Sequence, residues 1–439
     1  MAGETTSSSI TASAAANPSI IIVGAGIGGL TLALTLHQIG VSCVVLEQAP
    51  ALGPLGVGIN IQPNAVRELY DLGIDEAALA DIGIPCREWA LLGRNGREIY
   101  AEPRGLDAGY RWPQFSVHRG RLQMLLLQQV IDRLGPDAVK TGHQVLDYDQ
   151  HGQGVTVSVL TDGHTKTLEA DALIGADGIR SRLRQRMNPS EGDVHWGGAI
   201  MWRGVTRAKP IRTGASFVGI GSLNQRFVCY PISQPDPATG LVELNWIAEI
   251  TVANKDEWSK ADWNRSVDAE VVLAHFKDWQ YTWLDVPAFI RGAPSIFEYP
   301  MIDRDPIDTW VDGRVALMGD AAHAMYPTGS NGASQAIVDA RMLGAMLLKH
   351  GDYEAAFSAF DAALCEPISA LVLRNRGAGP FALLGLVDDR CNGEFEDISQ
   401  VIPKAEMDEL MGDYKRAAGY AKESLNQAES LITNSVHSL

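Results

Sequence analysis

Two glycine-rich segments have the spacing needed to hold a phosphate-containing ligand. The first places glycines at Gly24, Gly26 and Gly29, directly after the apolar run at residues 20–23. This G-x-G-x-x-G spacing lets backbone N–H groups and a helix N-terminus approach a pyrophosphate closely. A tight turn with a purely structural purpose is the alternative, so the motif needs support from other residues.

An acidic residue supports the nucleotide interpretation. Glu47 follows a second apolar run at residues 41–46, where a dinucleotide site carries the acid that accepts hydrogen bonds from a ribose. A carboxylate in this place repels a 2′-phosphate. We therefore expect a ribose without that phosphate at this site.

The second glycine-rich segment lies near residue 320. It follows the apolar run at residues 315–318, begins with Gly319 and Asp320, and continues into a turn that includes Gly332. Two such segments far apart in the sequence indicate one long ligand that is contacted by both, as FAD would be. The sequence therefore predicts a flavoenzyme with tightly bound FAD.

Composition limits the other classes of function. The chain has 439 residues and a formal net charge of −17, which argues against nucleic acid or an anionic membrane surface as a partner. An anionic small substrate is still allowed, because one local arginine can outweigh distant charges. Five scattered cysteines indicate no metal site, and no run approaches the ~20 apolar residues of a membrane span. Residues 1–18 lack the features of a secretory signal, so we expect a cytoplasmic protein.

Hydrophobic patterns give the order of the elements that position these motifs. Strands are expected at residues 19–23, 41–46 and 171–176, and helices at 29–38, 119–134 and 405–431. Between about 194 and 299 the pattern becomes strand-like and rich in tryptophan. The expected units are a disordered tail at 1–18, an FAD-binding domain at 19–190 and 300–390, a substrate-binding sheet domain at 191–299, and a helical segment at 391–439.

Three motifs together resemble those of the single-component FAD-dependent aromatic hydroxylases. They are D-G-x-x-S-x-x-R from Asp177 to Arg184, the pair Gly319 and Asp320, and Arg119. In that family the first motif serves both FAD and a passing NAD(P)H, the aspartate bonds the ribityl chain, and the arginine contacts the flavin side chain. An ordinary Asp-Gly turn with solvated arginines is the alternative for the first motif.

The resemblance covers roughly residues 19–376 and is strongest to the branch of salicylate hydroxylases and methylphenazine-carboxylate hydroxylases. The matching stretches are 54–63, which includes Gly58, and 201–205, 299–306 and 325–327. This likeness implies an α/β fold like that of para-hydroxybenzoate hydroxylase, in which a Rossmann-like FAD-binding domain holds an inserted β-sheet domain. One departure is that Ser330 and Ser334 replace a glycine and an asparagine of the wider family.

The resemblance also implies a reaction. NADH or NADPH reduces FAD, O₂ adds to give a C4a-hydroperoxyflavin, and an electron-rich aromatic substrate, here expected to be a carboxylic acid, is hydroxylated. The sequence has no second strand, G-x-G-x-x-G turn and helix, so NAD(P)H is expected to bind only transiently. A flavin oxidase or dehydrogenase, or a non-catalytic flavin-binding protein, is the alternative. The pattern does not decide between a monomer and a homodimer.

The chemistry requires apolar walls with few polar anchors. We predict Pro327 beside the reacting oxygen, and Tyr230 and Arg203 as the other candidate catalytic residues. Arg203 either holds a substrate carboxylate or pairs with an acid inside the sheet. Further wall candidates, each of which could equally be ordinary core, are Trp202, Trp246, Tyr299, Met301 and Tyr326. His323 is expected to serve the loop structure or the cofactor.

Overall fold

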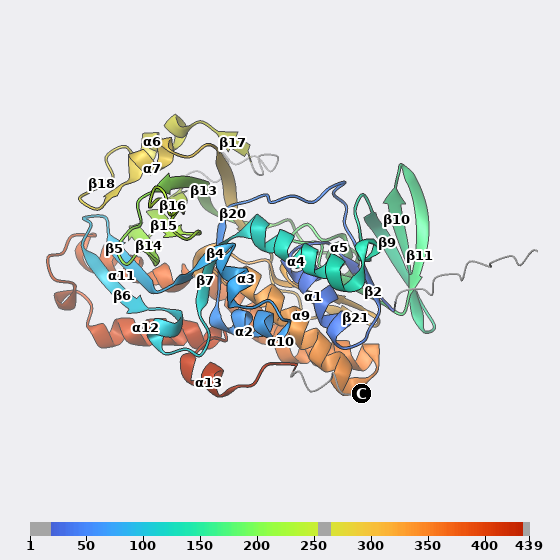
Figure 1. Cartoon of the computed structure of the whole chain (residues 1–439). Coiled ribbons are helices and arrows are strands. Elements are labelled where there is room, and N and C mark those ends of the chain that lie inside the picture. Colours follow the sequence, from blue (N-terminus) through green and yellow to red (C-terminus); the bar gives the residue numbers. More distant parts are fainter. Residues whose placement is uncertain (1–18, 253–264, 433–439) are drawn as a thin grey trace, which may run out of the picture.

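The computed structural model describes residues 19–252 and 265–432 and shows a mixed α/β protein (Figure 1). A nucleotide-binding part occupies one half of the molecule, and a large sheet occupies the other half. The expected tail at residues 1–18 lies outside the described residues. The same is true of residues 253–264 and 433–439.

The nucleotide-binding part is built on a six-stranded sheet with the order β21-β22-β12-β1-β2-β8. All neighbouring strands are parallel except β21 and β22. Every residue of β1 is buried, as expected for the centre of a parallel sheet that is covered on both faces. The strands are β1 (Ile20–Val23), β2 (Cys43–Leu46), β8 (Val139–Lys140), β12 (Ala172–Gly175), β21 (Val311–Asp312) and β22 (Val315–Leu317).

Helices pack around this sheet, and two small sheets belong to the same part of the molecule. Helix α1 begins at Ile27 directly after the first glycine-rich turn, and it packs against α4 and α9. The helices are α1 (Ile27–Gln38), α2 (Pro63–Asp71), α3 (Glu76–Ala80), α4 (Arg119–Leu134), α5 (Arg182–Met187), α8 (Asp320–His323), α9 (Gly332–His350) and α10 (Tyr353–Arg376). The small sheets are β3 (Gly58–Ile61), β7 (Gln114–His118) and β4 (Gly83–Cys86), and β9 (Gln144–His151), β10 (Gly154–Thr161) and β11 (His164–Ala170).

The second half is an eight-stranded sheet with the order β17-β20-β13-β16-β15-β14-β5-β6. Two of its strands, β5 and β6, come from before residue 191, so the expected segment 191–299 does not form this sheet alone. Helices α6 and α7 pack on one face. The elements are β5 (Glu88–Gly93), β6 (Glu98–Pro103), β13 (His195–Ala208), β14 (Ser216–Gly221), β15 (Gln225–Pro231), β16 (Val242–Thr251), β17 (Arg265–Val267), α6 (Ala269–Phe276), β18 (Gln280–Tyr281), β19 (Leu284–Asp285), α7 (Val286–Arg291) and β20 (Ile296–Asp303).

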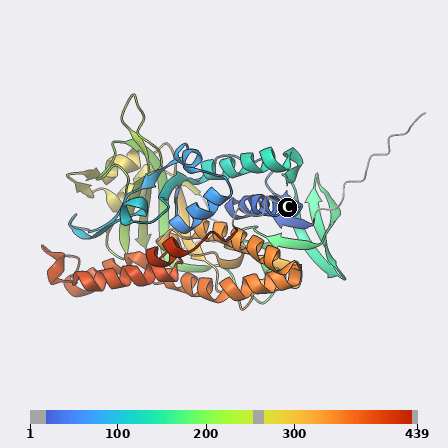
Figure 2. The same ribbon diagram turned by 60° about the horizontal axis from the view of Figure 1, so that its bottom comes forward.

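The C-terminal segment runs along one side of both halves (Figure 2). It contains α11 (Ala382–Cys391), α12 (Lys404–Ala417) and α13 (Lys422–Gln427). The stretch 405–431, which the sequence predicts to be helical, is divided between α12 and α13. Gly419 has a φ of 71°, and this left-handed residue ends α12 and separates it from α13.

One segment, Tyr353–Cys391, contains a window apolar enough to cross a membrane by length and composition alone, which is weak evidence for a membrane span. In the structure α10 packs against α9 and buries Phe357, Phe360 and Leu371. A core helix of a soluble protein passes the same test of composition. The packing of α10 accounts for its apolar character.

Candidate active site

A cavity of about 330 Å³ lies between the nucleotide-binding part and the eight-stranded sheet. Both glycine-rich segments line this cavity, so the fold brings together the two motifs that lie far apart in the sequence. The predicted cofactor residues on its wall are Gly26, Gly58, Arg119, Gly319, Asp320 and Gly332, and the predicted catalytic residues there are Arg203, Tyr230 and Pro327.

The first glycine-rich turn is shaped by close backbone approaches. A Cβ atom at Gly24, whose φ is 104°, would overlap the carbonyl oxygen of Ala176, and one at Gly29 would overlap the carbonyl oxygen of Gly24. By contrast, a Cβ at Gly26 would have nothing within 4 Å. Gly24 and Gly29 therefore form the turn, and Gly26 leaves open space beside the N-terminus of α1.

Glu47 holds this turn from the end of β2. Its carboxylate accepts hydrogen bonds from the Ala25 N–H at 2.9 Å and the Ala49 N–H at 2.7 Å. Glu47 is not part of the cavity wall. In this geometry it stabilises the turn, and a ribose contact would come in addition to these two bonds.

The loop that carries Asp320 to the cavity is held by a buried residue, Asp339, which the sequence did not indicate. Asp339 accepts hydrogen bonds from the Gly319 N–H at 2.9 Å and from Gln335 at 2.8 Å, and it lies 2.6 Å from His323 Nε2. Burial disfavours the charged imidazole, but the Asp339 carboxylate outweighs this effect and raises the pKa of His323. His323 thus serves the loop. The Asp320 carboxylate is exposed and makes no hydrogen bond to any described residue.

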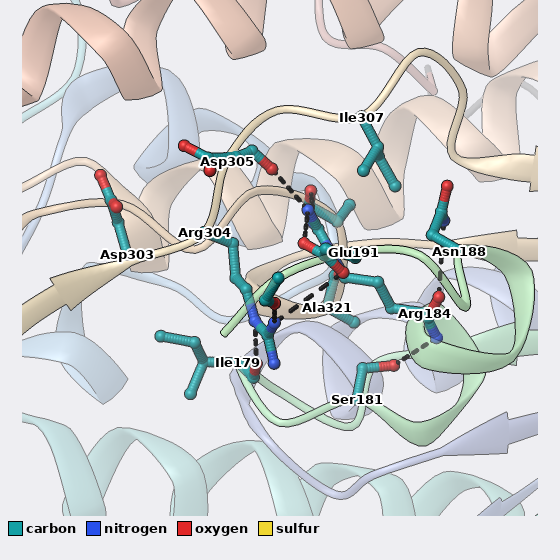
Figure 3. Close-up of polar contacts among 12 residues, drawn as sticks. Ile179, Ser181, Arg184, Asn188, Glu191, Asp303, Arg304, Asp305, Ile307 and Ala321 are labelled. Atoms are coloured by element: carbon teal, nitrogen blue, oxygen red, sulfur yellow. Dashed lines mark hydrogen bonds and ion pairs between the residues drawn. The ribbon is translucent and has the colours of Figure 1, made fainter. Parts of the chain in front are cut away.

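Arg184, the last residue of the D-G-x-x-S-x-x-R motif, is the centre of a network of polar contacts (Figure 3). Arg184 is buried, and its guanidinium donates to the Glu191 carboxylate at 2.6 Å and to the carbonyls of Ala322 and Asp305. The Ser181 hydroxyl caps α5 by accepting a bond from the Arg184 N–H. Arg184 is not part of the cavity wall, and the service of this motif to FAD and NAD(P)H stays a prediction.

Asp177 of the same motif also lies behind the cavity. Its carboxylate accepts a hydrogen bond from the Arg182 N–H at 2.9 Å, and burial raises its pKa. The neighbouring Gly178 lines the cavity. The motif therefore shapes the backbone at the cavity edge and supports the loop after β22, which carries Asp320.

Gly58 joins the two halves of the molecule at the cavity. Its N–H donates to Asn245 Oδ1 at 2.7 Å, and its carbonyl accepts bonds from Arg203 and from the Tyr230 hydroxyl, both at 2.8 Å. Burial raises the pKa of Tyr230 to about 12, so this hydroxyl is protonated near neutral pH. Two of the three predicted catalytic residues thus hold β3 against the sheet.

Arg203 carries a positive charge that no carboxylate of the described residues neutralises. Within residues 19–252 and 265–432 no salt bridge involves Arg203, and its Nε makes no hydrogen bond. Burial lowers its pKa, and the nearby Arg119 acts in the same direction. The alternative of pairing with an acid inside the sheet is therefore wrong for the described residues.

The rest of the wall is mainly apolar. It is formed by Met201, Phe217, Val228, Ile247, Met325, Pro327 and Phe381. The ring of Phe217 stacks on Tyr230 with centroids 5.0 Å apart. One charged pair, Arg226 and Glu249 at 2.5 Å, also lines the cavity, and Arg226 lies over the ring of Phe381.

Several aromatic residues that were wall candidates do not line the cavity. Side chains alternate along a strand, so Met201 and Arg203 face the cavity and Trp202 between them faces α6 and α7. Trp246 is turned away in the same manner. A third group, Tyr299, Met301 and Tyr326, packs behind the wall in a cluster that includes the cavity residues Met201 and Ile247. Strict alternation could have identified Met201 and Ile247, but no sequence signal indicated Phe381.

These features fit FAD. The open space at Gly26 beside the α1 N-terminus suits a pyrophosphate, and the Asp320 carboxylate is available to a hydroxylated chain. Ser334, which departs from the wider family, accepts a hydrogen bond from the Gln62 N–H and so has a structural partner. Ser330 adopts a left-handed conformation with a φ of 53°.

Comparison with known proteins agrees with the site. Residues 18–273 and 295–366 match a family described as an FAD binding domain. The chain is 43% identical over 362 residues to phenazine 1,6-dicarboxylic acid hydroxylase of Lysobacter antibioticus, covering 81% of this chain and 89% of that protein. It is 30% identical over 366 residues to 3-hydroxybenzoate 6-hydroxylase 1 of Aquipseudomonas alcaligenes, with coverages of 81% and 84%. The solved structure of Klebsiella pneumoniae HpxO with FAD and uric acid matches with a TM-score of 0.70 at 25% identity, covering 93% and 96%.

The fold and the cavity therefore define an FAD-binding oxidoreductase with the expected α/β architecture. More specifically, the chain belongs to the single-component FAD-dependent aromatic hydroxylases, which are the class A flavoprotein monooxygenases. The sequence-based predictions of the family, the fold class, the cofactor FAD and the enzymatic nature of the protein are confirmed.

Replacing Asp320 by Ala should weaken FAD binding by about 1–3 kcal/mol, the range for losing a charge-assisted hydrogen bond. Glu47→Ala should have a smaller effect, because Glu47 acts by holding the turn and water can replace part of a ribose contact. Titration of the FAD-free proteins with FAD, followed by flavin fluorescence, measures both dissociation constants. Full and equal FAD retention in the two variants would contradict the assignment of the FAD site to these residues.

Replacing Arg184 by Ala should lower the free energy of unfolding by about 3–5 kcal/mol, because it leaves the Glu191 carboxylate and two carbonyls without their donor. The matched control is Arg186→Ala, whose ion pair with Asp147 is exposed and should contribute less than about 1 kcal/mol. Urea unfolding of the FAD-free proteins compares them. Equal stability of the two variants would contradict the network assigned to Arg184.

Proposed function

We propose that this enzyme hydroxylates a planar, electron-rich aromatic carboxylic acid and consumes NAD(P)H and O₂. When bound, FAD takes electrons from NAD(P)H and activates O₂ for transfer of one oxygen atom to the ring. The protein must then bind the ring, orient it and keep water away. The residues on the cavity wall can perform these three tasks.

The observation that carries this proposal is the uncompensated charge of Arg203. A partly buried guanidinium without a protein carboxylate is costly, and a carboxylate from a ligand would neutralise it through charge-assisted hydrogen bonds. Its bond to the Gly58 carbonyl fixes the guanidinium at the cavity wall while leaving other N–H groups available. We therefore assign Arg203 to the substrate carboxylate.

Tyr230 and Pro327 have supporting parts in this proposal. Tyr230 is protonated near neutral pH, donates to Gly58 and stacks with Phe217, so it orients the aromatic ring and does not act as a base. Pro327 lies on the cavity wall within the second glycine-rich segment. We propose that it lies beside the reacting oxygen. Apolar neighbours such as Ile247 exclude water from the same space.

The names of related proteins support this class of substrate. The relatives from Lysobacter antibioticus and Aquipseudomonas alcaligenes act on a phenazine dicarboxylic acid and on 3-hydroxybenzoate, and both compounds are aromatic acids. We favour a fused-ring acid, hydroxylated at or beside the carbon that carries the carboxyl group, because the first of these relatives is the more similar one.

The nicotinamide cofactor is proposed to bind only transiently. A further Gly-x-Gly pair, Gly219 and Gly221, lies in the buried strand β14 with no helix directly after it, so it does not build a second dinucleotide site. We also propose a cytoplasmic location for the enzyme, where NAD(P)H is available.

The carboxylate assignment is tested with matched substrates. An aromatic acid should stimulate NAD(P)H oxidation about 10–100 times more efficiently than its methyl ester, as expected for a charge-assisted anchor. Arg203→Met should abolish this preference. Tyr230→Phe is the matched control, because it also removes one hydrogen bond to the Gly58 carbonyl but keeps the charge of Arg203. The assignment fails if Arg203→Met keeps the preference of the wild-type enzyme for the acid.

A further inference from the structure

The C-terminal helix α12 reaches the edge of the cavity through one buried tyrosine. The Tyr414 hydroxyl donates a hydrogen bond to Asn375 Oδ1 at 2.7 Å and accepts one from Asn331 Nδ2 at 2.6 Å. Only 1% of its surface is exposed. One hydroxyl therefore links the end of α10 to the residue that precedes α9.

The segment contacted by Tyr414 forms part of the cavity wall. It comprises the short helix η4 (Pro327–Gly329) and residues 330–332, and we call it the 327–332 turn. The cavity wall includes Pro327, Thr328 and Asn331 from this turn. Pro327 is the residue that we place beside the reacting oxygen.

The conformation of this turn depends on Tyr414 in two ways. Asn331 occupies the N-cap position of α9, yet its side chain makes no capping bond and is directed to the tyrosine hydroxyl. A Cβ atom at Gly329 would overlap the same hydroxyl, so the backbone of the turn packs directly on Tyr414. The Thr328 hydroxyl donates to the Asn375 carbonyl and completes the contact.

We propose that Tyr414 is a positioning residue that holds the 327–332 turn against bound FAD and the substrate. This inference rests on the proposed function and adds the C-terminal segment to the active site. The region that matches the FAD-binding family ends at residue 366, so the family match does not include Tyr414 or Asn375.

The physical reason lies in what remains when the hydroxyl is removed. A phenylalanine keeps the ring and its packing, but it leaves Asn331 Nδ2 and Asn375 Oδ1 buried without partners. Such groups are costly, and the turn can lower that cost by moving towards water in the cavity. Even a small movement matters, because reacting groups must be held to within about 0.5 Å.

The test compares the full-length Tyr414→Phe variant with the wild-type protein. We expect the dissociation constant of FAD, measured by flavin fluorescence on titration of the FAD-free protein, to rise about tenfold. We also expect less hydroxylated product and more hydrogen peroxide for each NAD(P)H consumed. Tyr110→Phe is the matched control, since its hydroxyl lies in the same hydrophobic cluster and donates to the Tyr420 carbonyl, away from the turn.

The outcomes separate positioning from general stability. Both variants should lose similar thermal stability, but only Tyr414→Phe should change FAD affinity and the ratio of product to peroxide. The effect of Tyr414→Phe should be reduced in an Asn331→Ala background, because the two residues act through one bond. Unchanged FAD affinity and product ratio in Tyr414→Phe, or equal changes in Tyr110→Phe, would overturn the proposal. If no aromatic acid is hydroxylated by the wild-type protein, the proposed function fails, while the affinity measurement still tests Tyr414.

Discussion

The approach of Gly58 to the eight-stranded sheet is the constraint on which the rest of the structure depends. A Cβ atom at this position would lie 2.6 Å from the Cβ of Asn245, so only glycine allows β3 to come this close. The contact brings the Gly58 backbone within reach of Asn245, Arg203 and Tyr230, which satisfy both of its polar groups. The cavity is closed on this side because the two halves meet at Gly58, and the cofactor turns and the substrate wall then face the same space.

The electrostatics of the cavity differ from those of the whole chain. The protein carries a formal net charge of −17, but the cavity wall presents two arginines without a carboxylate partner among the described residues, Arg203 and Arg119, against one such carboxylate, that of Asp320. Arg226 adds little net charge, because Glu249 neutralises it. An anionic ring system is therefore attracted locally despite the acidic surface. The apolar remainder of the wall strengthens this attraction by excluding water.

Local sequence patterns predicted the elements around the cofactor well. Contacts between residues far apart in the sequence could not be predicted in this way. The first glycine-rich turn, α4 and the strand before Asp177 follow from short periodic segments with clear end signals. The support of Asp320 by Asp339 and the enclosure of Arg184 by Glu191 depend on residues brought together only by the fold. The aromatic wall was partly mispredicted because tryptophan is as common in a core as in a pocket, and strand alternation turned Trp202 and Trp246 away. Phe381 lines the cavity and Tyr414 contacts the 327–332 turn of its wall. Both residues lie outside the resemblance.

The central claim is that the FAD-binding cavity transfers one oxygen atom from O₂ to an aromatic acid. The most direct measurement is turnover of the purified FAD-bound enzyme with NAD(P)H and ¹⁸O₂ in ordinary water, with the product analysed by mass spectrometry. The account predicts an aromatic product that contains one ¹⁸O atom, formed only when the substrate and the reduced nicotinamide are both present. Consumption of NAD(P)H that yields only hydrogen peroxide, or a product oxygen derived from water, would contradict it.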